Sequence, residues 1–78
     1  MSQKQKLIAK FLDRPKTIKY RELVMILEYF GFVQIPAKGS HVKYCHYKLT
    51  TDLIIPVHKN ECKDFYKELA KEYIQKIK

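Results

Sequence analysis

The sequence predicts an α+β fold in which helices and strands follow one another in the order α-α-β-β-β-α. Three observations lead to this prediction. Two short segments near the N-terminus and one longer segment near the C-terminus space their apolar residues as helices do. Between them lie three runs that are typical of β-strands, and turn residues separate these runs. With 78 residues, the chain has the size of one small domain, residues 1–78.

Three amphipathic helices are expected, each with an apolar stripe. The first spans Gln3–Leu12 and ends at Asp13-Arg14-Pro15, and the second spans Tyr20–Phe30. Gly31 follows the second helix, where a left-handed residue is expected. The third helix is expected from about Glu61 to Ile77, with Asn60 as its N-cap.

The apolar stripes of these helices would form one side of the core. They consist of Leu7, Ile8, Phe11 and Leu12 in the first helix, Leu23, Val24, Leu27 and Phe30 in the second, and Phe65 or Tyr66, Leu69, Ala70, Tyr73, Ile74 and Ile77 in the third.

The three predicted strands are Phe32–Ala37, Val42–Tyr47 and Asp52–Val57, and they form a simple antiparallel meander. Pro56 cannot donate a ladder hydrogen bond, so the third strand is expected at an edge of the sheet. A four-residue loop, Lys48–Thr51, would pair the last two strands so that His41 lies opposite His58, Val42 opposite Val57, and Tyr44 opposite Ile55. This register places two sets of side chains on opposite faces: Val42, Tyr44, Leu53, Ile55 and Val57 under the helices, and His41, Lys43, Tyr47 and His58 on the open face.

The charge of the chain points to an anionic partner. The net charge is +8, with 16 Lys and Arg against 8 Asp and Glu. Much of the excess lies in the first 21 residues, where Asp13 is the one acidic residue, so a polyanion such as RNA would be attracted there first. The alternative is that these charges form an ordinary solvated surface and bind no partner.

No apolar run approaches the roughly 20 residues of a membrane span. Two cysteines without a secretion signal favour free thiols and a cytoplasmic location.

Several motifs resemble those of one protein family, the HicA toxins of bacterial type II toxin–antitoxin systems. The resemblance covers roughly residues 20–75, and its most specific element is Gly39-Ser40-His41 at the start of a strand. The other motifs are Arg21-Glu22-Leu23 through Leu27, Gly31-Phe32, Lys38, Tyr44, and Ile55-Pro56-Val57-His58.

The resemblance implies a fold like that of double-stranded-RNA-binding domains, α-β-β-β-α, for a core at residues 18–78. Residues 1–17 form an additional basic extension with a short helix. The family relation further implies an mRNA interferase, an endoribonuclease involved in the stress response that a HicB-like antitoxin protein neutralises. The functional histidine of the family corresponds to His41.

His41 is accordingly expected to act as a general acid or base without a metal cofactor, because an imidazole exchanges protons near neutral pH. His58, Lys43 and Ser40 would support it. The lysines expected to contact RNA are Lys38, Lys43, Lys59, Lys63 and Lys67. The alternative for the lysines of the last helix is that they form ordinary surface ion pairs, because acidic residues lie three or four positions away. These acidic residues are Asp64, Glu68 and Glu72.

The sequence suggests several other interpretations. Cys45, His46, His58 and Cys62 contain the elements of a zinc site, but neighbouring strand residues point to opposite faces, which argues against it. His46 is expected on the inward side, packed or hydrogen-bonded. The same fold would also suit a non-catalytic RNA-binding module or a protein-interaction domain.

Overall fold

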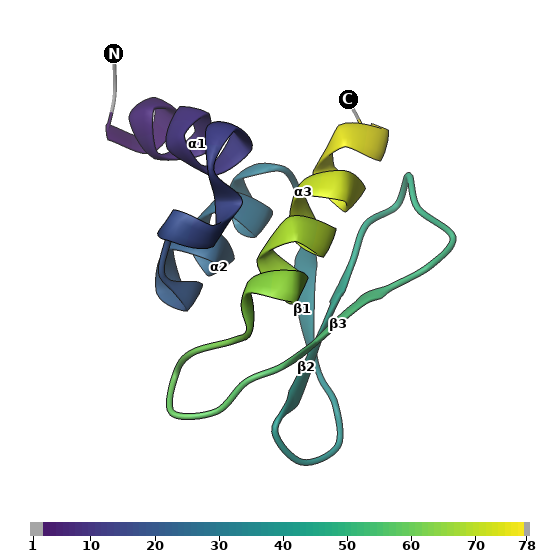
Figure 1. The fold of residues 1–78 in the computed structure, drawn as a ribbon. Helices are drawn as coiled ribbons and strands as arrows, with labels where there is room; N and C mark the ends of the chain where they lie inside the picture. Colours follow the sequence, from purple (N-terminus) through teal and green to yellow (C-terminus); the bar gives the residue numbers. More distant parts are fainter. Residues whose placement is uncertain (1–2, 78) are drawn as a thin grey trace.

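The computed structural model describes residues 3–77 and contains three α-helices and a three-stranded sheet (Figure 1). Residues 1, 2 and 78, which the predicted extension (1–17) and core (18–78) include, lie outside the described residues. The elements are α1 (Gln3–Asp13), a short 3-10 turn η1 (Pro15–Thr17), α2 (Tyr20–Tyr29), β1 (Val33–Pro36), β2 (His41–Cys45), β3 (Leu53–Pro56) and α3 (Asp64–Ile77). The predicted α+β class and element order are confirmed.

The sheet is an antiparallel meander in the order β1-β2-β3, which places β3 at an edge as predicted. The predicted register is wrong by two residues, because His41 pairs with Pro56 and Tyr44 with Leu53. His41 therefore does not lie opposite His58. A shift of two residues preserves the faces of a strand, so Tyr44, Leu53 and Ile55 are still buried against the helices.

The register differs because β2 ends earlier than predicted, and residues 46–52 form the connection to β3. His46 leaves the ladder and turns into the structure, where Nε2 lies 2.8 Å from the Phe30 carbonyl oxygen. The backbone N–H of Lys48 donates to Nδ1 of His46 at 3.1 Å. Nδ1 is thus an acceptor, which assigns the ring proton to Nε2 and makes His46 a neutral donor to Phe30. The prediction of a packed, hydrogen-bonded His46 is confirmed.

Gly31 makes room for this histidine. Its φ of +92° lies in the region that favours glycine, and a Cβ added there would lie 3.2 Å from Nε2 of His46. The backbone conformation and the nearby ring therefore require the same residue.

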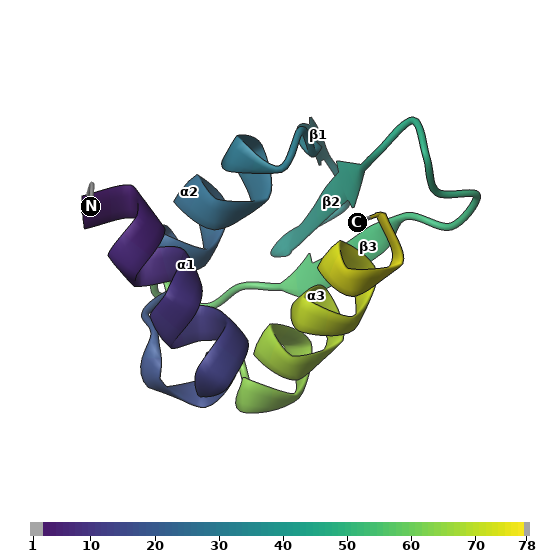
Figure 2. The ribbon, with the colours of Figure 1, turned by 90° about the horizontal axis from the view of Figure 1, so that it is seen from above.

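Helices α2 and α3 cover one face of the sheet, and α1 lies on the side of the helices away from the strands (Figures 1 and 2). Phe11 of α1 is completely buried, so this helix is part of the packed core. The Tyr20 and Tyr44 hydroxyls are 2.8 Å apart in the interior, and burial raises the pKa of Tyr44. The fully buried large side chains are Phe11, Ile18, Leu23, Ile26, Leu27, Tyr44, Leu53, Ile55 and Ile74.

The segment before α3 differs from the prediction. Lys59 and Asn60 both have positive φ values, 50° and 62°, and His58 and Glu61 exchange two backbone hydrogen bonds of 2.9 Å. This is the geometry of a two-residue type I′ turn. Asn60 tolerates the left-handed conformation and belongs to this turn, so its predicted role as N-cap is wrong and α3 begins at Asp64.

Candidate functional site

His41 is the first residue of β2, and its side chain is exposed. A tight turn precedes it, in which the His41 N–H donates to the Lys38 carbonyl at 3.2 Å. Gly39 has φ of +64° with open space around it, so the backbone conformation of the turn, and not crowding, favours glycine there. The Val57 N–H donates to the Ser40 carbonyl at 2.9 Å. These bonds hold the backbone of His41 from both neighbouring segments.

The open face of the sheet carries Lys43 between two exposed isoleucines. Ile35, Lys43 and Ile54 are register partners in one row across the three strands. Lys43 is half-buried, and its Nζ lies 3.8 Å from Oδ2 of Asp52. Val33, Ile35 and Ile54 are 59%, 39% and 46% exposed. The face that bears His41 therefore combines one ammonium group with an apolar surface that the described chain leaves uncovered.

The β1–β2 turn and the β3–α3 segment lie at the same end of the molecule (Figure 1). Three exposed lysines lie in these segments, Lys38 in the first and Lys59 and Lys63 in the second. His58 is also exposed, just beyond β3, with its backbone paired to Glu61. The structure thus brings His41, His58 and these lysines to one end, although the two histidines are not cross-strand partners.

Lys67 is placed differently from the other lysines predicted to bind RNA. Its side chain is 6% accessible, with Nζ 3.2 Å from Oε1 of Glu61 and 3.9 Å from Oδ1 of Asp64. The Cys62 backbone N–H also donates to Glu61, and these two contacts hold the pKa of the Glu61 carboxyl below its usual value. The ammonium of Lys67 is therefore a structural partner of Glu61, and it is not exposed as Lys59 and Lys63 are.

The two thiols are free, with Cys45 half-buried and Cys62 buried. Burial raises the pKa of the Cys62 thiol, which keeps it protonated at neutral pH. Within residues 3–77, no three His, Cys, Asp or Glu side chains lie close enough together to hold a metal ion. The residues considered for zinc, Cys45, His46, His58 and Cys62, accordingly form no such cluster.

A small pocket adjoins the His41 end of the sheet, and sequence reasoning did not anticipate it. Pro56, the cross-strand partner of His41, forms one wall, and Tyr66 of α3 forms another. His58, Glu61, Cys62 and Lys63 complete the lining. The type I′ turn assembles the pocket by folding Glu61 back beside His58, and Asn60 was the available sequence signal for such a turn.

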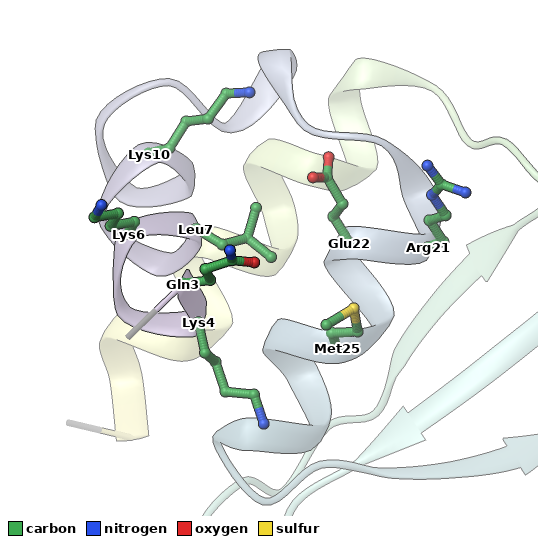
Figure 3. Close-up of a pocket in the computed structure, with 8 residues that line it drawn as sticks. All are labelled: Gln3, Lys4, Lys6, Leu7, Lys10, Arg21, Glu22 and Met25. Carbon is green, nitrogen blue, oxygen red and sulfur yellow. The ribbon is translucent and has the colours of Figure 1, made fainter. Parts of the chain in front are cut away.

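A second, larger groove separates α1 from α2 (Figure 3). Leu7, Met25, Gln3 and the carboxylate of Glu22 line it together with four basic side chains, Lys4, Lys6 and Lys10 from α1 and Arg21 from α2. The sequence located this positive charge near the N-terminus. Phe11, which is fully buried, and Leu7, Ile8 and Leu12, which pack against the core, hold α1 beside the rest of the fold.

The fold and the site define a small basic α+β domain with helices on one face of its sheet and an exposed histidine among lysines at one end. A family model described as the HicA toxin of bacterial toxin–antitoxin systems matches residues 20–77. The chain therefore belongs to the HicA toxin family, which confirms the resemblance seen in its motifs. Comparisons with curated proteins and with solved structures give no significant match. Helix α1 precedes the matched residues. Among residues 3–77, no helix is long and apolar enough to cross a membrane.

Proposed function

We propose that this protein is the RNA-cleaving toxin of a type II toxin–antitoxin system, an mRNA endoribonuclease in which His41 is the general acid or base. The position of His41 is the observation that carries the proposal. Its imidazole is exposed, and backbone hydrogen bonds from His41 to Lys38 and from Val57 to Ser40 hold the turn that bears it. The same end of the molecule also presents Lys59 and Lys63. We place this activity in the cytoplasm, where mRNA is translated.

The proposed chemistry uses the ribose 2′-hydroxyl as nucleophile. An imidazole removes its proton, the oxygen attacks the adjacent phosphorus, and the 5′-oxygen leaves with a proton supplied by an acid. His41 serves as the base or as the acid, and His58 or water takes the other role. We expect Lys38, whose carbonyl accepts the His41 N–H, and Lys43, two residues further along β2, to stabilise the additional negative charge of the phosphorane. This scheme assigns no step to a metal ion.

The direct test is RNA cleavage by purified protein in the presence of EDTA. His41→Ala should lower the cleavage rate by about 10²–10⁴-fold, the usual contribution of a positioned acid or base. Its urea midpoint should match the wild type because the side chain is exposed. His58→Ala is the matched exposed histidine and should lose less activity. Cleavage by His41→Ala at the wild-type rate would refute the assignment. RNA binding without cleavage by the wild type would indicate a non-catalytic RNA-binding module.

The open face of the sheet supports a protein partner as well, which we propose is a HicB-like antitoxin. Val33, Ile35 and Ile54 present exposed apolar side chains beside Lys43, and the outer edges of β1 and β3 have no partner strand in the described sheet. An acidic antitoxin on this face would cover His41 and exclude RNA.

This arrangement predicts mutual exclusion. A purified toxin–antitoxin complex should neither bind nor cut RNA, and added RNA should compete with antitoxin for wild-type toxin. The measurement is a competition titration with labelled His41→Ala protein, which binds without destroying the RNA. A complex that retains the RNA affinity of the free toxin would contradict the model, as would an interface restricted to the helical side.

A further inference from the structure

The pocket beside His41 has a chemical character that the proposed cleavage does not require. Pro56 lines the pocket and pairs directly with His41, so the Cβ atoms of these two residues lie about 4.5–5.5 Å apart. Tyr66, a half-buried aromatic residue on the first turn of α3, also lines the pocket. Flat side chains of this kind are the surfaces on which unpaired RNA bases stack.

The turn at Lys59-Asn60 provides the polar edge of the pocket. Because His58 and Glu61 are a hydrogen-bonded pair across this turn, their side chains project from the same face of the turn and both line the pocket. Lys63 lines it too and is exposed. The pocket thus combines a cation for phosphate with an acceptor for base-edge donors.

Glu61 is a fixed acceptor in this arrangement. Its Oε1 already receives the Cys62 N–H at 3.1 Å and lies 3.2 Å from the Lys67 ammonium. An ionised carboxylate offers about four acceptor positions, and the Glu61 side chain is 50% accessible. These contacts orient the carboxylate and leave it capacity for donors on a ligand.

We propose that this pocket binds a single RNA base that carries an amino group on its Watson–Crick edge, stacked on Tyr66 and hydrogen-bonded to Glu61. Guanine fits best, because its ring N–H and amino group are adjacent donors that can both reach Oε2 of Glu61, the oxygen that the Cys62 and Lys67 contacts do not use. Uracil fits worst, because its one N–H on that edge is flanked by two carbonyl oxygens that a carboxylate repels. Occupancy would position the neighbouring phosphate at His41, a role that rests on the proposed function.

The binding test uses His41→Ala protein, full-length, and the four nucleoside 3′-monophosphates, followed by NMR shifts of residues 56–66. Guanosine 3′-monophosphate should bind most tightly and the uridine nucleotide most weakly. Tyr66→Leu should weaken guanosine nucleotide binding by at least about fivefold, the lower end of what base stacking contributes. Tyr66→Phe should retain binding. Tyr29→Leu, the same change at an exposed tyrosine of α2 outside the pocket, is the matched control.

Glu61→Gln tests selectivity. Glutamine replaces one carboxylate oxygen by an NH2 group, which cannot accept the guanine donors but can donate to a uracil carbonyl, so the preference for guanosine over uridine nucleotide should shrink. Equal affinity of all four nucleotides for the parent protein, or shifts that avoid residues 56–66, would overturn the inference.

These outcomes separate the pocket from the catalytic proposal. Nucleotide binding that depends on Tyr66, in a protein whose wild type does not cut RNA, would support the pocket and refute the nuclease. Metal-free cleavage that depends on His41, without nucleotide binding at the pocket, would do the reverse. In an active protein, Tyr66→Leu should also broaden the choice of cleavage sites, whereas Tyr29→Leu should leave it unchanged.

Discussion

Replacing Lys67 by methionine tests whether this lysine serves the structure or the RNA. The Lys67 side chain is 6% accessible and its ammonium is 3.2 Å from Glu61. Lys63, four residues earlier and immediately before α3, is exposed. If burial decides the role, Lys63→Met should weaken RNA binding and Lys67→Met should not.

The expected size of the stability effect follows from the burial of the pair. The attraction between the Lys67 ammonium and the Glu61 carboxylate is offset by the cost of removing the ammonium from water, and solvent screens the half-exposed carboxylate. Methionine fills the same volume without that cost. Lys67→Met should therefore change the free energy of unfolding by no more than about 1 kcal/mol. Lys67→Ala also removes the buried stem and should cost about 2 kcal/mol or more.

The assay pairs urea unfolding with RNA binding at several salt concentrations, in the catalytically impaired His41→Ala background. Each lost phosphate contact should reduce the slope of log affinity against log salt by about 0.7 for single-stranded RNA. Lys63→Met should show this reduction, and Lys67→Met should keep the parent slope. An equal loss of slope in both variants would refute the argument from burial.

Two further predictions follow from the same contacts and from the N-terminal helix. Because hydrogen bonding from Cys62 and the ion pair with Lys67 lower the pKa of Glu61 in the folded protein, its contribution to stability is present above the unfolded pKa of about 4.3 and is lost as pH falls through the lower folded value. Urea midpoints between pH 6 and pH 3 should therefore fall more for the wild type than for Glu61→Gln, and parallel curves would contradict this. The triple variant Lys4→Gln, Lys6→Gln, Lys10→Gln should fold normally, since all three side chains are exposed, and should have a smaller salt slope if the α1–α2 groove contacts RNA. An unchanged slope would assign the groove to another role. Deleting α1 is a poorer test, because it removes the buried Phe11.

Patterns in the amino-acid sequence were sufficient to predict the element order, the faces of the strands and the family. These depend on local patterns: the spacing of Leu23 and Leu27 in α2, the alternation that buries Tyr44, Leu53 and Ile55, and Gly31 at a left-handed position. Which face a strand residue lies on depends only on the alternation along that strand. The predicted faces were therefore correct although the predicted register was shifted by two residues. The Gly39-Ser40-His41 motif likewise located the candidate histidine before any pairing was known, and its chemical role stays a prediction.

The register of β2 and β3, the burial of Lys67 and the pocket lined by Pro56 and Tyr66 became visible in the folded structure. His46 bonds to Phe30 and does not continue β2, which ends at Cys45, and Pro56 pairs with His41. The turn at Lys59-Asn60 carried Glu61 back to Lys67 and beside His58. Each of these outcomes arises from a contact between segments far apart in sequence, or from a turn chosen among several that the same residues allow. Local periodicity carries no information about such contacts, because their free energy depends on which groups the folded chain brings out of water together.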